Sequence, residues 1–231
     1  ETERISAEAA DQRAGRAGRV AAGRAIRLWD PRERLRPHRE PDIARVDLAS
    51  PILDVIAWGG DPRTLMWFEA PPADALDRTI DLLVALGIVD ASLRLTPLGR
   101  DVRRLPLHPR LGRLLIETGA APAAARACAL LSERHFLPPA AGSTSCDLLA
   151  AVDRGQALPP HVQRVARDIR ATARQTLGDR ARASVADETF RRAVLGAYPD
   201  HVGRRRAAGS DRFLLASGTG GPLARQSGVV H

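Results

Sequence analysis

Residues 74–97 read DALDRTIDLLVALGIVDASLRLTP, and this stretch predicts a helix, a short hairpin and the start of another helix. Apolar residues recur every three or four positions in its first half and predict one buried helical face. They are Leu76, Ile80, Leu83 and Val84. Gly87 suits the left-handed position that ends many helices. Apolar pairs on either side of 90–92 predict two short strands, and Thr96 before Pro97 is typical of a helix start.

A helical pattern also precedes this stretch. Apolar residues between 43 and 56 predict one or two helices before Gly59-Gly60. Helices followed by a two-stranded β-wing are the outline of a winged-helix domain, which we place at residues 41–105. Farther on, prolines at helix-start positions predict a helical bundle over residues 106–200. These prolines are Pro109, Pro122, Pro159 and Pro160.

The composition supports a mainly α-helical protein. The chain has 231 residues, of which 44% are hydrophobic and only 3% aromatic, so the core must consist of Leu, Val, Ala and Ile. All 35 cationic residues are arginine, and the lack of lysine and asparagine indicates a GC-rich bacterial genome. The net charge of +8 favours a polyanionic partner.

Residues 12–19, QRAGRAGR, carry the strongest indication of chemistry. On a helix, one amide and two guanidiniums of this block fall at positions i, i+4 and i+7, on one face. They belong to Gln12, Arg16 and Arg19. Gly15 and Gly18 each cost roughly 1 kcal/mol relative to alanine inside a helix, so helix propensity does not explain them. They would let another surface come close, and the polar face suits a bound polyphosphate.

This block resembles motif VI of the DEAH-box helicases of superfamily 2, residue for residue. Four later segments resemble the same family in the expected order, namely FEAPP at 68–72, LLVALG at 82–87, LTPLGR at 95–100 and LPLHPRL at 105–111. The likeness extends from residue 1 to about residue 135. Beyond it, Tyr198-Pro199-Asp200, Arg204–Arg206 and LLASGTGG at 214–221 resemble the C-terminal extension of the bacterial HrpB type.

The resemblance implies four parts. Residues 1–40 would be the C-terminal end of a second RecA-like α/β domain with its linker, and residues 41–105 the winged helix. Residues 106–200 would be a helical, ratchet-like domain, and 201–231 the start of a further domain with a short β segment. Within the first part, the alternation at 24–29 predicts a strand.

By the same resemblance, Gln12 positions the γ-phosphate of ATP or the attacking water, and Arg16 and Arg19 act as arginine fingers. Such arginines contribute about 10³–10⁵ in rate. The implied cofactors are ATP and Mg²⁺, bound mainly outside this sequence, and the implied partner is single-stranded RNA or DNA. The function expected is that of the C-terminal part of an ATP-dependent RNA helicase, which couples ATP hydrolysis to movement on nucleic acid.

The chain by itself is not expected to hydrolyse ATP. A P-loop needs a lysine on the phosphates, and this sequence contains neither a lysine nor an Asp-Glu-x-His motif. It also starts with Glu1 instead of methionine. We therefore expect that the upstream half is omitted from this sequence and not lost in nature.

Two arginine groups are candidates for nucleic-acid phosphates. The helix expected at 161–176 has Val162, Val165, Ile169 and Ala173 on one side and Arg164, Arg167, Arg170 and Arg174 on the other. These four arginines could bind a strand without sequence preference, or could form a solvated charged face. The same alternatives hold for Arg204–Arg206. Arg13 is expected to form an ion pair, and Trp29, Trp58 and Trp67 to anchor the core.

Several kinds of site are disfavoured. The six histidines show no HxH or HExxH spacing, so no metal site is expected. Cys128 and Cys146 are too few for a disulfide framework and favour a reducing cytoplasm. No apolar run approaches the ~20 residues that span a bilayer, so no membrane association is expected. No segment indicates an obligate protein partner.

Two other functions stay open at this point. The first is a non-catalytic winged-helix regulator that binds nucleic acid. It would need a basic recognition helix, whereas residues 74–86 contain three aspartates and one arginine. The second is a pseudo-helicase remnant that keeps the arginine face without the P-loop half. Both readings leave Gln12, Arg16 and Arg19 without a chemical role.

Overall fold

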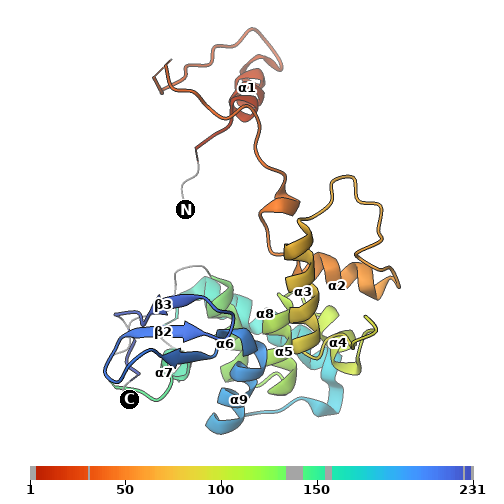
Figure 1. Ribbon diagram of the computed structural model, residues 1–231, viewed down its shortest axis with the longest axis vertical. Coiled ribbons are helices and arrows are strands. Elements are labelled where there is room, and N and C mark those ends of the chain that lie inside the picture. Colours follow the sequence, from red (N-terminus) through yellow and green to blue (C-terminus); the bar gives the residue numbers. More distant parts are fainter. Residues whose placement is uncertain (1–3, 31, 134–142, 154–157, 226, 230–231) are drawn as a thin grey trace. The chain divides into compact units, whose positions relative to one another are not determined.

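A computed structural model describes residues 4–30, 32–133, 143–153, 158–225 and 227–229 (Figure 1). It divides into two compact units. The first consists of Glu1–Asp47 with Trp67–Pro72, and the second of Leu48–Met66 with Ala73–His231. The described residues are mainly helical, with a small sheet near the C-terminus, and this confirms the fold class predicted from the sequence.

The first unit contains one α-helix, α1 (Ala7–Gly15), which continues into a 3₁₀ turn at Arg16–Gly18. A second 3₁₀ turn spans Asp42–Ala44. The strand predicted at 24–29 is absent, and Ile26 and Leu28 are 72% and 93% exposed. A strand needs a neighbour for its backbone hydrogen bonds, and the described part of this unit contains no other strand. That prediction is therefore wrong for this structure.

The start of α1 is fully hydrogen-bonded. The Ser6 hydroxyl accepts from the N–H of Ala9 at 3.3 Å, as its N-cap position predicts. The N–H groups of Ala7 and Glu8 donate to the carbonyls of Arg36 and Pro37 at 2.8 and 3.1 Å. Free N–H groups at a helix start need such acceptors, so the segment 36–37 fixes the position of α1 within its unit.

The second unit begins with α2 (Ala49–Ala57), α3 (Ala73–Ala85) and α4 (Pro97–Arg103). The chain leaves α3 through Gly87, whose φ of +61° is left-handed. Its N–H donates to the carbonyl of Val84 at 2.8 Å, and that of Ile88 donates to Leu83 at 3.1 Å, which closes a Schellman motif. The predicted wing is reduced to a single bridge between Val89 and Leu95.

A turn around Asp90 explains why the wing is short. Its carboxylate accepts the N–H groups of Ser92 and Arg94 at 2.8 and 3.0 Å, so these donors are not available for a longer ladder. Thr96 then caps α4 by accepting the N–H of Gly99 at 3.0 Å. A Cβ on Gly99 would lie 2.0 Å from the carbonyl oxygen of Ile88, so this glycine lets α4 lie directly against the wing.

Five further helices form the larger part of the second unit: α5 (Pro109–Glu117), α6 (Pro122–Ser132), α7 (Asp147–Asp153), α8 (Pro160–Leu177) and α9 (Asp187–Ala197). The helix starts predicted at Pro109, Pro122 and Pro160 are confirmed. In Figure 1, α5, α6 and α8 lie together, and α6 packs most extensively on α8, and α5 on α9. Their buried residues include Leu114, Leu115, Cys128, Val162, Ile169 and Phe190.

A three-stranded antiparallel sheet follows, in the order β1 (Gly203–Arg205), β2 (Arg212–Leu215) and β3 (Gly220–Pro222). It confirms the short β segment predicted for the C-terminus. Beyond it, Asp147 at the start of α7 accepts the Ser227 hydroxyl at 2.6 Å and the N–H of Gly228 at 2.8 Å. These bonds attach residues 227–228 to the helical body.

Candidate functional site

The polar face predicted on residues 12–19 lies where α1 tightens into the 3₁₀ turn. Gln12 and Arg16 remain one α-helical turn apart, at i and i+4. From Arg16 to Gly18 the backbone is 3₁₀, and side chains three residues apart eclipse in that geometry. Arg19 therefore comes almost directly behind Arg16 along the helix. The tightening brings the Cα–Cβ directions of these two arginines closer to each other than a continuous α-helix would.

These three side chains face solvent. Gln12, Arg16 and Arg19 are all exposed, and no hydrogen bond or ion pair joins their side chains to a described residue. A Cβ placed on Gly15 or Gly18 would meet nothing within 4 Å. The glycines therefore do not serve close packing within this unit. The surface beside the two arginines is open to a ligand or to another domain.

Other contacts hold α1 in place and engage its carboxylates. Asp11 pairs with Arg27, and Glu8 accepts from Nδ1 of His38 at 2.9 Å. Arg13 was expected to form an ion pair, but it makes none with a described residue. Instead it lines a cavity of about 380 Å³ on the side of α1 that faces residues 36–45. Gln12, Arg16 and Arg19 are thus the part of the helix that the unit itself does not use.

The donors at this face suit an anion. Two guanidiniums and an amide can donate to phosphate oxygens, and an arginine stays charged at any physiological pH. None of the three can ligate Mg²⁺ as a carboxylate would. In the described residues, His, Cys, Asp and Glu side chains nowhere gather in a group of three that could hold a metal ion. The face therefore offers hydrogen-bond donors and positive charge to an anion, and no carboxylate to a metal ion.

The four arginines of α8 do not form one uniform face. Arg164, Arg167 and Arg174 are exposed, whereas Arg170 is half-buried and donates Nε to the carbonyl of Ala120 at 3.2 Å. The apolar side of the helix is also shifted, because Ala166 is buried and Val165 is only half-buried. Arg167 and Arg170 line a cavity next to α6. Arg164 and Arg174 therefore belong to a solvated charged face, whereas Arg167 and Arg170 face the cavity.

The side chains of the three consecutive arginines at 204–206 do not all lie on the same face of the C-terminal sheet. Arg205 is half-buried, and its guanidinium lies 5.3 Å from the ring centre of Phe213. Arg204 and Arg206 alternate with it and are exposed, as is Arg212 on β2. The alternation of a strand thus puts Arg205 on the covered face and its two neighbours on the open one.

The prediction that the tryptophans anchor the core is wrong. Trp58 is 86% exposed at the end of α2, and Trp29 and Trp67 are only half-buried. The Arg27 guanidinium lies 5.7 Å from the Trp29 ring centre. The core is instead made of small and aliphatic side chains around Phe190, as the low aromatic content allows.

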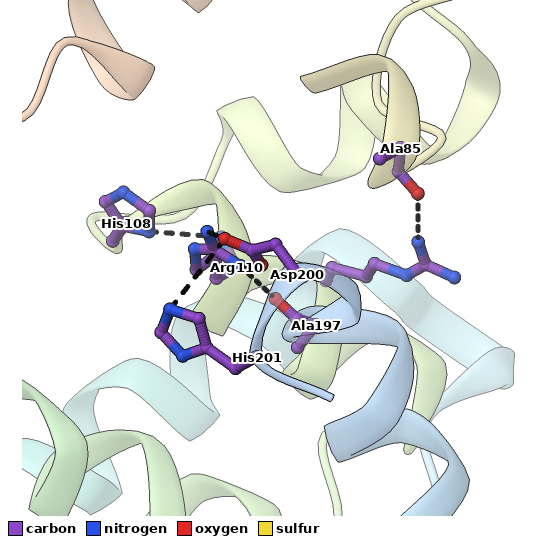
Figure 2. Close-up of polar contacts among 7 residues, drawn as sticks. Ala85, His108, Arg110, Ala197, Asp200 and His201 are labelled. Atoms are coloured by element: carbon purple, nitrogen blue, oxygen red, sulfur yellow. Dashed lines mark hydrogen bonds and ion pairs between the residues drawn. The ribbon is translucent and has the colours of Figure 1, made fainter. Parts of the chain in front are cut away.

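Sequence reasoning missed a role that several arginines share, which is to bind the carbonyls at the ends of other helices. Arg113 on α5 donates to Ala85, the last residue of α3, at 3.2 Å. Arg110, also on α5, donates to Ala197, the last residue of α9, at 3.1 Å (Figure 2). A cation is favourable at a helix C-terminus, where carbonyls lack partners. No periodicity could reveal these pairs, because the partners are 28 and 87 residues apart.

Comparison with known proteins gives a consistent result. No family model matches the chain. The ATP-dependent RNA helicase HrpB of Escherichia coli is 33% identical over 230 residues, which is 96% of this chain and 26% of the relative. A crystal structure of E. coli HrpB superposes with a TM-score of 0.69 and 29% identity, again over 96% of this chain and 26% of the other. The chain is a homologue of the HrpB-type DEAH-box helicases.

Other helicases match a smaller share. HrpA of E. coli is 41% identical over 123 residues, or 50% of this chain, and the probable helicase DHR2 of Saccharomyces cerevisiae is 37% identical over 49% of it. The similarity to HrpB continues through almost the whole chain, so the HrpB-type resemblance seen in the sequence is confirmed. The chain spans about a quarter of the length of HrpB.

Proposed function

We propose that this chain is the C-terminal part of an ATP-dependent RNA helicase, and that its residues 12–19 complete a nucleotide site formed mainly by other domains. One observation carries the proposal. Gln12, Arg16 and Arg19 are held on an anchored helix, have no partner among the described residues, and lie beside glycines that leave the surface open. The homologues are ATP-dependent RNA helicases, which supports the same conclusion.

The chemistry of the face follows from its donors. As phosphoryl transfer proceeds, negative charge shifts among the oxygens around the γ-phosphorus, and Arg16 and Arg19 would neutralise it. Gln12 would hold a phosphate oxygen or orient the attacking water through its amide. The described residues supply no carboxylate cluster for Mg²⁺, so other domains would have to hold that ion, which would supply further positive charge at the phosphates. Closing of those domains around ATP would bring the arginines into reach, and release after hydrolysis would let them separate.

The partner that we propose is single-stranded RNA, with DNA as the alternative polyanion. The arginines of α8, Arg164, Arg167, Arg170 and Arg174, would contribute phosphate contacts, which supply affinity without reading sequence. Their positive charge has a single acidic neighbour on the same helix, Asp168. The cytoplasmic location inferred from the two cysteines stays a prediction. No described helix has the length and apolar character needed to cross a membrane.

The winged-helix regulator is disfavoured by the surface of α3. Asp74 pairs with Arg78 at 2.7 Å, and Asp77 pairs with Arg63 at 3.0 Å, so aspartates and their partners occupy the solvent side of that helix. Direct readout of duplex DNA needs free donors on the helix that enters the groove. This helix is better suited to packing within a larger assembly.

The test is steady-state ATP hydrolysis by the longer polypeptide that joins the upstream helicase domains to this chain, with and without single-stranded RNA. We expect Arg16→Ala to lower the RNA-stimulated rate by about a hundredfold or more while ATP still binds. Arg13→Ala is the matched control, because it removes the same charge from a neighbouring position of α1 whose side chain lines the cavity toward residues 36–45. Equal losses in both variants would contradict the arginine-finger role. RNA binding without any ATP hydrolysis in the wild type would favour the regulator.

A further inference from the structure

A cavity of about 410 Å³ opens between α6 and α8. Small apolar side chains, among them Ala125 and Ala166, line it together with three arginines and one carboxylate. The charged residues are Arg126, Arg167, Arg170 and Asp153. Pockets of a few hundred Å³ with an apolar wall and a few converging polar groups are typical of small-ligand sites. The charge of this one selects the kind of ligand.

Two of the arginines are fixed in position by the helices around them. Nε of Arg126 donates to the carbonyl of Val152 at 3.0 Å, and Nε of Arg170 donates to that of Ala120 at 3.2 Å. Each guanidinium has five N–H donors, so the terminal nitrogens stay available after this bond is made. No side-chain nitrogen or oxygen in the described part of the chain is buried without a partner, so solvent reaches these nitrogens. The protein itself therefore orients two of the three guanidiniums, those of Arg126 and Arg170.

The positive charge of the cavity is not balanced. Arg126, Arg167 and Arg170 form no ion pair with a described residue, and Asp153 is the one carboxylate in the lining. A planar guanidinium binds phosphate through two parallel N–H donors. Like charges that face one cavity repel one another, and a bound dianion or phosphodiester would relieve this repulsion.

We infer that this cavity binds the phosphate of one nucleotide unit, with the sugar or base against the alanine-lined wall. The unit could belong to an RNA strand, in which case the inference rests on the proposed function, or it could be a free nucleotide. The chemistry is the same in both cases. All residues that line the site belong to the second unit, so the site needs no contribution from Gln12, Arg16 or Arg19.

The experiment measures binding of a fluorescently labelled 12-nucleotide single-stranded oligouridylate and of uridine monophosphate to the full chain. Arg167→Gln is the principal variant, because Arg167 makes no hydrogen bond within the described structure and its loss should leave the fold intact. Arg126→Gln is the second variant. Arg192→Gln on α9 is the control, since it removes one charge from an exposed i,i+4 pair with Glu188. Thermal unfolding checks that each variant is folded.

We expect each pocket variant to weaken oligonucleotide binding about tenfold and to lower the salt slope by about 0.7, the value for one phosphate contact on a single strand. The control should stay within about twofold of the wild type. Uridine monophosphate that competes with the strand would identify a free nucleotide as a ligand too. If it fails to compete at millimolar concentration, the strand is the source.

Two outcomes would overturn the inference: equal effects of all three substitutions, or a wild-type chain that binds neither probe. If Arg126→Gln unfolds the chain, Arg167→Gln decides alone. Neither outcome bears on the nucleotide role of Arg16, which the ATP hydrolysis test decides with a different variant. A wild-type chain that binds neither probe would also count against the RNA contacts proposed for α8. Conversely, a pocket that binds nucleotides in a protein without ATP hydrolysis would leave this inference standing.

Discussion

Arg110 and Asp200, which are 90 positions apart, form a bidentate ion pair with Nη1 to Oδ1 at 2.6 Å and Nη2 to Oδ2 at 2.7 Å (Figure 2). The Arg110 side chain is only 12% exposed, and its guanidinium lies 5.2 Å from the ring centre of Tyr198. The pair joins the start of α5 to the segment that leads into the C-terminal sheet. Both partners belong to motifs that resemble helicase segments, yet their contact is a structural one.

We predict that Asp200→Asn lowers the free energy of unfolding by about 1–2 kcal/mol. Breaking a fully buried pair costs more, but the Asp200 side chain is 36% exposed, so solvent screens part of the loss. Denaturant unfolding of wild type and variant measures the difference. Glu188→Gln, which breaks an exposed pair with Arg192, should change stability by less than about 0.5 kcal/mol. A similar small change for Asp200→Asn would contradict the structural role.

The same pair predicts a pH dependence. The hydrogen bond from Arg110 holds the pKa of Asp200 below its ordinary value of 3.8. Because the folded pKa is the lower one, the contribution of Asp200 is fully present above the unfolded value and is lost as the pH falls through the folded value. Between about pH 5 and pH 2, wild type should therefore lose more stability than Asp200→Asn. Parallel curves would show that the ion pair does not contribute.

Gly99→Ala is predicted to destabilise the second unit by about 3 kcal/mol, because the new methyl group would lie 2.0 Å from the Ile88 carbonyl oxygen and force α4 away from the wing. Thermal or denaturant unfolding measures it. A loss of less than about 1 kcal/mol would mean that the Val89–Leu95 segment can move at little cost, and that α4 does not need to lie so close to the Ile88 carbonyl.

Gly15→Ala, in contrast to Gly99→Ala, should stabilise this chain. Nothing lies within 4 Å of its added methyl group, and alanine is the better helix former by roughly 1 kcal/mol, so α1 should become more stable. In the helicase that we propose, the same substitution should slow ATP hydrolysis if another domain approaches this surface. Unchanged activity there would show that the glycine is not needed for close approach.

The two cysteines should differ strongly in reactivity. Cys128 is fully buried, its thiol donates to the Leu111 carbonyl at 3.4 Å, and burial raises the pKa of that thiol. Cys146 is half-buried at the start of α7. A thiol reagent at neutral pH should modify Cys146 first and Cys128 only at the rate of unfolding. Cys146→Ser is the control, since it should leave a single slow phase.

Local features of the sequence determined much of this structure. The ends of several helices are decided by residues within one turn of them. The hydroxyls of Ser6 and Thr96 accept free N–H groups at helix starts, and a proline there has no N–H to satisfy. Gly87 adopts the left-handed conformation that ends α3. The helical class follows from periodicity and composition, whereas the short C-terminal sheet was expected from the resemblance to the helicase family. The QRAGRAGR block indicated the polar face because its chemistry is contained in eight adjacent residues.

What the tertiary structure alone decided involves partners distant in the chain. The strand expected at 24–29 does not form, because a strand depends on a neighbour that its own sequence cannot supply. The arginines of α8 look equivalent along the helix, yet the packing of α6 gives Arg167 and Arg170 a cavity and leaves Arg164 and Arg174 in solvent. The sequence shows which residues are charged. Whether an arginine finds a carboxylate or a carbonyl as its partner depends on which atoms folding brings within hydrogen-bonding distance.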